Sequence, residues 1–178
     1  ELHFFNSTDL TEESISEYEK NFDPKENHTL IGEKTPEYCF PYAIDRIYEY
    51  NPNMKLLFFL REPISRCFSE VNMNNQKFDI DMDDLFKWLA NADDGKTITD
   101  VNGMSAFYNL RGFYDEFIEY IYTKFPKENV YIGISEEIKK NKDKEYKKIF
   151  DFLGCNYDKN IDINTWDIED LHVREYTT

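Results

Sequence analysis

Residues 55–69, KLLFFLREPISRCFS, place basic and hydroxyl side chains directly after an apolar run. The guanidinium of Arg61 offers a fork of N–H donors that can bind a phosphate, and the hydroxyl of Ser69, nearly two helical turns further on, could add a donor from the same side. These residue types in this order predict a phosphate-binding corner. The alternative interpretation is that Arg61 pairs with an acid such as Glu62 and that Ser69 is an ordinary helix residue.

The elements around Arg61 must place it at such a corner. Residues 56–60 lack polar alternation, which predicts a strand covered on both faces in an α/β sheet. Pro63 suits the first turn of a helix, because its missing N–H breaks no intrahelical bond there. Ligands of such sheets bind at the carboxyl ends of strands, and free N–H groups at a helix amino terminus favour anions. We therefore expect Arg61 to lie where the strand ends and the helix begins.

The pattern Arg-x-Pro-x-x-Arg-x-x-Ser after a buried strand resembles the 3′-phosphate-binding motif of sulfotransferases that use 3′-phosphoadenosine 5′-phosphosulfate (PAPS). Residues 1–6, ELHFFN, resemble Glu-Leu-His-Phe-Phe-Asp of the heparan sulfate glucosaminyl 3-O-sulfotransferases, and residues 32–38, GEKTPEY, are similar to their Glu-Lys-Thr-Pro-x-Tyr. A looser similarity extends through residues 112–154. The four blocks occur in the family's order, so the resemblance covers most of residues 1–155.

The resemblance implies a role for each of three further residues. Glu1 matches the family's catalytic base, and a carboxylate within reach of an acceptor hydroxyl suits that task. Lys34 matches the active-site lysine, whose ammonium would stabilise charge that develops in the transition state. His3 would share a strand face with Glu1 and help to position the acceptor or the base. This scheme requires PAPS as sulfuryl donor and no metal.

Without the resemblance, the same segments have plainer interpretations. Glu1 and His3 could be polar positions on a short alternating strand, and residues 34–36 could be the exit from a strand, because the residue before a proline avoids the helical region. Asn6 replaces the family's Asp, which removes a charge and weakens the case for a basic or amine-bearing acceptor.

A second departure from the family concerns the loop that grips the 5′-phosphosulfate. The family has a Gly- and Lys-containing loop before its Glu-Leu-His segment, and the six glycines here are too scattered to form one. The family's later loop over the nucleotide also has no counterpart in residues 162–178. We therefore expect residues 1–178 to be one sulfotransferase domain that is truncated at both ends.

Composition limits the other possibilities. A chain of 178 residues with 40% hydrophobic content can bury one core, and no apolar stretch is long enough to cross a bilayer. The three cysteines are widely spaced, which favours free thiols and weakly favours the cytoplasm over the Golgi lumen, although the compartment stays unknown. The formal net charge of −15 makes nucleic acid an unsuitable partner and would slow the approach of a polyanion such as heparan sulfate.

The periodicity of the remaining sequence predicts alternating strands and helices. We expect strands at residues 30–33 and 129–134, and helices at residues 11–22, 42–50, 83–90, 105–125 and 146–153, with a polar loop at residues 93–103. Such alternation predicts a three-layer α/β fold of the P-loop NTPase-like type, in which helices flank a parallel sheet.

The function predicted from these observations is sulfuryl transfer from PAPS to a hydroxyl or amine, with a carbohydrate as the favoured acceptor. Two alternatives remain open. A P-loop kinase shares the architecture but needs a Walker loop and magnesium ligands that this sequence lacks. A non-catalytic nucleotide- or glycan-binding module could have kept the fold and lost the chemistry.

Overall fold

The structure is a computed structural model that describes residues 1–6, 10–24, 26, 30–78 and 112–158. Its elements in chain order are η1 (Phe4–Asn6), α1 (Glu12–Glu19), η2 (Pro36–Cys39), α2 (Pro41–Tyr50), β1 (Leu56–Leu60), α3 (Pro63–Phe78), α5 (Tyr114–Lys124), η4 (Lys127–Asn129), β2 (Val130–Ile134), α6 (Ser135–Lys140) and α7 (Lys142–Leu153). The predicted helix at 83–90 and loop at 93–103 lie outside the described residues.

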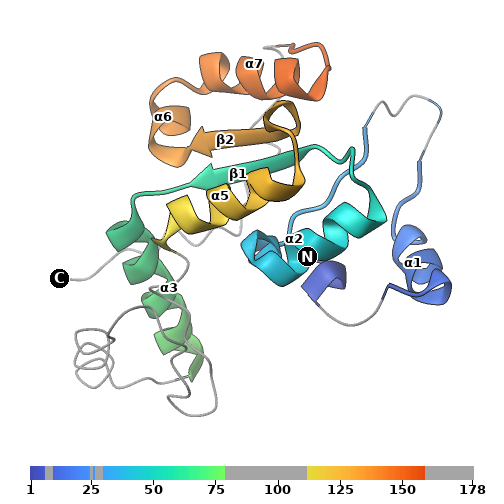
Figure 1. Cartoon of the computed structure of the whole chain (residues 1–178). Coiled ribbons are helices and arrows are strands. Elements are labelled where there is room, and N and C mark those ends of the chain that lie inside the picture. The colour runs from blue at the N-terminus through green and yellow to red at the C-terminus, as the bar shows by residue number, and fades with distance from the viewer. Residues whose placement is uncertain (7–9, 25, 27–29, 79–111, 159–178) are drawn as a thin grey trace.

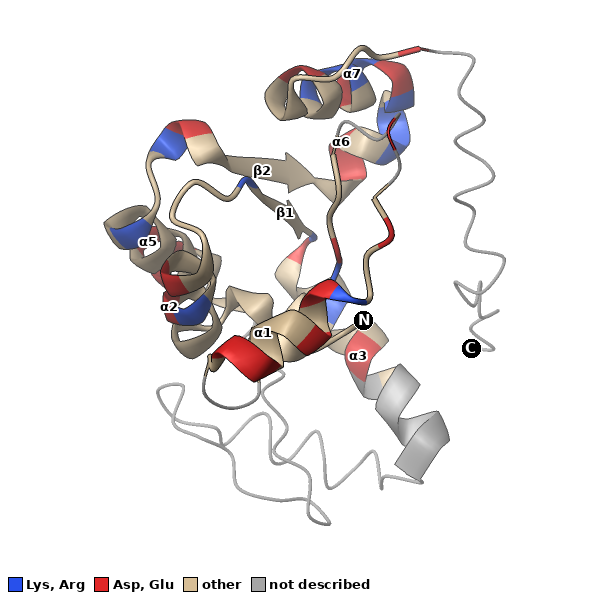
Figure 2. Cartoon of the chain, turned by 90° about the vertical axis from the view of Figure 1, so that its right-hand side faces the viewer, with Lys and Arg blue, Asp and Glu red and all other residues tan. Residues whose placement is uncertain are grey.

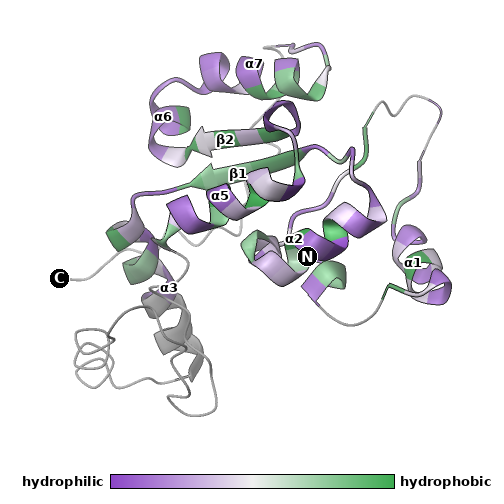
Figure 3. Ribbon diagram, viewed as in Figure 1, coloured by the Kyte–Doolittle hydropathy of each residue, from purple (hydrophilic) through white to green (hydrophobic). Residues whose placement is uncertain are grey.

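Strands β1 and β2 pair in parallel, with Leu56 opposite Val130 and Leu60 opposite Ile134. Figures 1 and 2 show the pair between α5 on one side and α7 on the other, which is the layered α/β arrangement that the alternation predicted. The apolar character of β1 is visible in Figure 3. The expectation of full cover on both faces is wrong for Phe59, which is half exposed.

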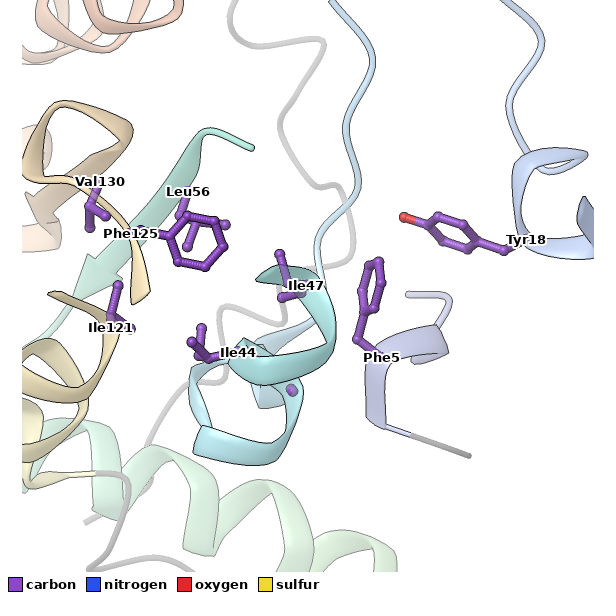
Figure 4. Close-up of a cluster of buried hydrophobic side chains, with 9 residues drawn as sticks. Phe5, Tyr18, Ile44, Ile47, Leu56, Ile121, Phe125 and Val130 are labelled. Carbon is purple, nitrogen blue, oxygen red and sulfur yellow. The ribbon is translucent and has the colours of Figure 1, made fainter. Parts of the chain in front are cut away.

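The core joins the amino-terminal segment to the sheet through α2. Figure 4 shows Ile44 and Ile47 of α2 between Phe5 on one side and Phe125 with the strand residues on the other. These side chains are almost fully buried, and Tyr18 of α1 closes the cluster beyond Phe5. Burial of apolar surface in this cluster therefore couples the position of residues 1–6 to that of β1.

The helix boundaries follow from local chemistry. Thr11 and Ser14 form a capping box at the start of α1, Pro41 occupies the first turn of α2, and Gly154 ends α7 with a φ of 79°, a left-handed conformation that glycine adopts without strain. The predicted helices at 11–22, 42–50 and 146–153 are thus confirmed apart from their ends, as are the strands at 56–60 and 129–134.

Two predicted elements differ from the structure. The single helix expected over 105–125 begins at Tyr114 in the described residues, because Phe113 has a ψ of 68° that no helix continues through. The strand expected at 30–33 is also wrong. Residues 30–35 form no ladder with any described strand, and the side chains of Leu30 and Ile31 are about half exposed, so no sheet neighbour covers them.

Among the described residues, no helix is long and apolar enough to cross a membrane. Cys39, Cys67 and Cys155 are half buried and form no disulfide.

Candidate functional site

Residues 1–6 lie alongside residues 33–38. The amide of Leu2 donates to Oε2 of Glu33 at 3.3 Å, and the amide of His3 donates to the Oγ1 of Thr35 at 3.4 Å. Lys34 lies between these two anchors in the sequence. The structure therefore brings Glu1 and Lys34, which are 33 positions apart, into neighbouring segments.

Glu33 is the centre of this junction, and no role was predicted for it from the sequence. Its Oε1 accepts hydrogen bonds from the hydroxyls of Tyr38 at 2.6 Å and Tyr18 at 3.1 Å. Burial, followed by the bond to Glu33, raises the pKa of Tyr38 to about 12, and burial with the charge of Glu33 raises the pKa of Tyr18 further still. Both tyrosines therefore stay protonated as donors to one carboxylate.

Phe5 and Arg46 hold the same segment from its other side. The amide of Phe5 donates to the Tyr38 hydroxyl at 3.4 Å, and Nη1 of Arg46 in α2 donates to the Phe5 carbonyl at 3.1 Å. The Phe5 ring is 1% exposed, with the rings of Tyr18, Tyr38 and Tyr50 centred within 5.5 Å. Segment 1–6 is thus fixed by both packing and hydrogen bonds.

The strand expected to carry Glu1 and His3 is wrong, although the two side chains do meet. Residues 1–3 have no strand geometry, and His3 has a φ of 54° before the turn of η1. In this conformation Nε2 of His3 lies 3.4 Å from Oε2 of Glu1, and Nδ1 lies 2.9 Å from Oε2 of Glu37. Glu37 is the second acid of the site that the sequence did not single out.

Lys34 is exposed, and its ammonium makes no hydrogen bond or ion pair with any described residue. Its three donors therefore have no partner in the described chain.

Arg61 lies at the carboxyl end of β1, as predicted. The hydroxyl of Tyr114, the first residue of α5, donates to the Arg61 carbonyl at 2.8 Å and fixes the corner. The guanidinium is half buried, and within the described chain it makes no hydrogen bond or ion pair, so the predicted alternative of an Arg61–Glu62 pair is not observed. Its donors are available for a planar anion.

Glu62 corrects one part of the predicted anion site. Its carboxylate accepts from the amides of Ile64 at 2.9 Å and Ser65 at 2.6 Å, so it caps α3. Its bonds with Ser65 and Ile64, with a smaller contribution from the Arg61 charge, lower the pKa of Glu62, which keeps the cap ionised. Two amides expected to be free for an anion are therefore already bonded. A phosphate at this corner would depend on the guanidinium rather than on these amides.

Ser69 lies half buried on α3, and its hydroxyl has no partner among the described residues. The neighbouring Arg66, which belongs to the same motif, pairs with Glu70 one turn along the helix at 2.5 Å. Arg66 is thus tied to α3, whereas the donors of Arg61 and Ser69 have no partner within the part of the chain that the structure describes.

The predicted residues form two groups. Glu1 and His3 lie in segment 1–6, beside segment 33–38, which carries Lys34. Arg61 follows the carboxyl end of β1, and Ser69 lies on α3. Among the described residues, no hydrogen bond or ion pair links Arg61 or Ser69 to the first group. The part of the chain that the structure describes also contains no group of three or more His, Cys, Asp or Glu residues placed to hold a metal ion.

Comparison with known proteins gives two matches. The model of the sulfotransferase domain family matches residues 40–170, a range that includes Arg61 and Ser69 and begins after Lys34. Among solved structures, the chain resembles the sulfotransferase from Alicyclobacillus acidocaldarius, with a TM-score of 0.67 and 21% sequence identity. That match covers 88% of this chain and 68% of the other, and at this identity it establishes a shared fold.

Proposed function

Because the chain belongs to the sulfotransferase family, we propose that it transfers a sulfuryl group from PAPS to a hydroxyl or amine of a carbohydrate. The observation that carries the proposal is the hydrogen-bonded junction of segments 1–6 and 33–38, because it places the segment that carries the Glu1 carboxylate beside the segment that carries the Lys34 ammonium. Sulfuryl transfer needs both. A base must take the proton of the acceptor, and a cation must stabilise charge on the departing phosphate oxygen.

In this proposal the residues of the chain divide the work between the two groups. Glu1 is the base, Lys34 stabilises the developing charge, and His3 positions the base. Arg61 and Ser69 hold the 3′-phosphate of the donor, since their unused N–H and O–H groups are the kind of donor that phosphate oxygens accept.

The acceptor is the least constrained part of the proposal. The motifs of segments 1–6 and 32–38 resemble those of heparan sulfate 3-O-sulfotransferases, which favours a sugar acceptor. The net charge of −15 weighs against a polyanion, and acidic residues are spread over α1, α3, α6 and α7 in Figure 2. We therefore propose a neutral or lightly charged glycan.

The test is a transfer assay on the full-length protein with a labelled sulfate donor and separate glycan, tyrosyl and small-alcohol acceptors. We expect label to pass to the glycan, and turnover to fall about 10²-fold or more in Glu1→Gln, the typical share of a general base. Transfer to none of the acceptors would refute the proposal, and transfer to tyrosyl or alcohol alone would refute the choice of carbohydrate.

Binding of the desulfonated nucleotide product tests the second group independently of turnover. Arg61→Ala should weaken this affinity by about 1.5–3 kcal/mol, the scale of a hydrogen bond to a charged group. Lys147→Ala is a suitable control, because it removes an exposed cation from α7 that pairs only with Asp151 in the described chain. Equal affinity in the two variants would contradict the role of Arg61.

A further inference from the structure

The ring of His3 lies between two carboxylates, and the two distances indicate which ring nitrogen carries the proton. Nδ1 lies 2.9 Å from Oε2 of Glu37, whereas Nε2 lies 3.4 Å from Oε2 of Glu1. A neutral imidazole has one N–H and can donate to only one of them. The shorter distance assigns the proton to Nδ1, because a bare Nδ1 lone pair would face the Glu37 oxygen at 2.9 Å.

The side chain of Asn6 contacts the same carboxylate and the same ring nitrogen. Its Nδ2 lies 2.7 Å from the same Oε2 of Glu37 and 3.2 Å from Nδ1 of His3. With the proton on Nδ1, both Asn6 and His3 donate to Glu37. The bare Nε2 lone pair then faces Oε2 of Glu1 at 3.4 Å, the longer of the two distances. The Glu37 carboxylate therefore collects two donors at one oxygen.

Position 6 also explains why an acid can occupy position 37. The resemblance described above has Asp at the place of Asn6, and a carboxylate there would meet that of Glu37 at hydrogen-bond distance. Like charges so close repel. The Asn6 amide donates a hydrogen bond to Glu37 instead, so that in this chain the carboxylate beside Nδ1 of His3 comes from position 37.

The backbone of His3 is constrained as well. Among the described residues, His3 is the one non-glycine with a positive φ, at 54°. L-residues rarely adopt this conformation, and it persists where the surroundings over-determine it. Bonds from the His3 amide to Thr35 and from the Asn6 amide to the His3 carbonyl supply that constraint here.

We propose that Glu37 is a positioning residue that holds the Nδ1–H of His3 and so directs the Nε2 lone pair at Glu1. This inference rests on the proposed function. Glu1 takes the proton from the hydroxyl or amine of the acceptor and passes it to Nε2, after which Glu1 is a carboxylate again. The imidazolium that results has an N–H directed at each carboxylate, so its charge is stabilised from both sides.

The primary test measures the ring rather than turnover. Multiple-bond ¹⁵N–¹H correlation spectra distinguish an Nδ1–H from an Nε2–H ring, and the chain has three histidines, so a His3→Gln variant assigns the signal. At a pH where the ring is neutral, we expect the Nδ1–H form of His3 in the unsubstituted protein. This form should be lost in Glu37→Gln and should largely persist in Glu37→Asp. Glu49→Gln, an exposed position of α2, is the control and should leave the ring unchanged.

Loss of folding is not expected to obscure this result. The side chains of His3, Glu1 and Glu37 are 45%, 43% and 36% exposed, and ion pairs at such exposure contribute little to stability. An Nε2–H ring in the unchanged protein, or an Nδ1–H ring that persists in Glu37→Gln, would overturn the proposal.

Turnover of the full-length protein gives the second test. Glu37→Gln should lower kcat by about 10-fold or more, less than the about 10²–10⁴-fold expected for loss of the base itself, and should leave affinity for the nucleotide product unchanged. If the unsubstituted protein is active and Glu37→Gln has the same kcat, the relay is overturned. If the unchanged protein transfers no sulfuryl group, the proposed function and the relay both fall, while the ring spectra still decide whether Glu37 orients His3.

Discussion

Replacement of Phe5 by alanine should detach the segment that carries Glu1 and His3. The ring is 1% exposed and has three tyrosine rings centred 5.3–5.5 Å away. Truncation of a buried Phe to Ala typically costs about 3–5 kcal/mol through lost burial and the cavity that remains. We expect the lower end, about 3 kcal/mol, because segment 1–6 can leave the core locally before the whole domain unfolds.

Two measurements on Phe5→Ala separate local from global effects. Urea denaturation gives the change in free energy of unfolding, and hydrogen exchange at the amides of Leu2 and Phe5 reports whether their bonds to Glu33 and Tyr38 still form. We expect faster exchange at both amides, together with a loss of transferase activity larger than the loss of folded protein. Phe113→Ala is the control, since that ring is 42% exposed and its removal should cost under about 1 kcal/mol. Equal unfolding free energies in the two variants would refute the assignment of Phe5 as the anchor.

Three further predictions concern the sheet, a helix end and pH. A methyl at position 133 would lie 2.8 Å from Cδ1 of Phe59, so Gly133→Ala should destabilise the fold by about 1–3 kcal/mol in urea denaturation, and an unchanged midpoint would contradict the predicted clash. Gly154→Ala should cost about 1–2 kcal/mol at a φ of 79°, and Gly154→Asn less, as thermal unfolding would show; equal costs would argue against strain. The pKa of Tyr38 is raised from 10.0 to about 12, so its contribution to stability is full below pH 10 and is lost as the pH rises towards 12. Between pH 10 and 12, the free energy of unfolding measured by denaturation should therefore fall less steeply with pH in Tyr38→Phe than in the unsubstituted protein.

The corner at Arg61 could be predicted because its signals are local. An apolar run long enough for one strand, a proline three residues after its last member and a helical pattern beyond it specify a strand, a turn and a helix. The structure places β1 and α3 at these positions. What the local pattern could not give was the role of Glu62, because whether an acid before a helix caps it or pairs with a neighbouring arginine depends on a choice of side-chain rotamer.

For the site at residues 1–6 and 33–38, the sequence predicted several of its residues but not the backbone conformation that holds them. The expected strands at residues 1–3 and 30–33 are absent from the described structure, and side-chain hydrogen bonds from Glu33 and Thr35 take the place of a backbone ladder. Polar and apolar residues alternate over residues 1–3, and two apolar residues begin residues 30–33. Both patterns are compatible with a strand whether or not a partner strand is available.

The sequence alone determined the fold class and most residue types of the site. The hydrophobic period, the prolines and glycines and the order of the motifs can all be read along the chain without knowledge of tertiary contacts. Only the tertiary structure decided that Glu33 joins two tyrosines to the amino-terminal segment and that Glu37 faces His3. The contacts of Tyr18 with Glu33 and of His3 with Glu37 join residues more than 10 positions apart. They form only when packing around Phe5 and α2 brings the segments together, and no period or motif along the chain specifies that meeting.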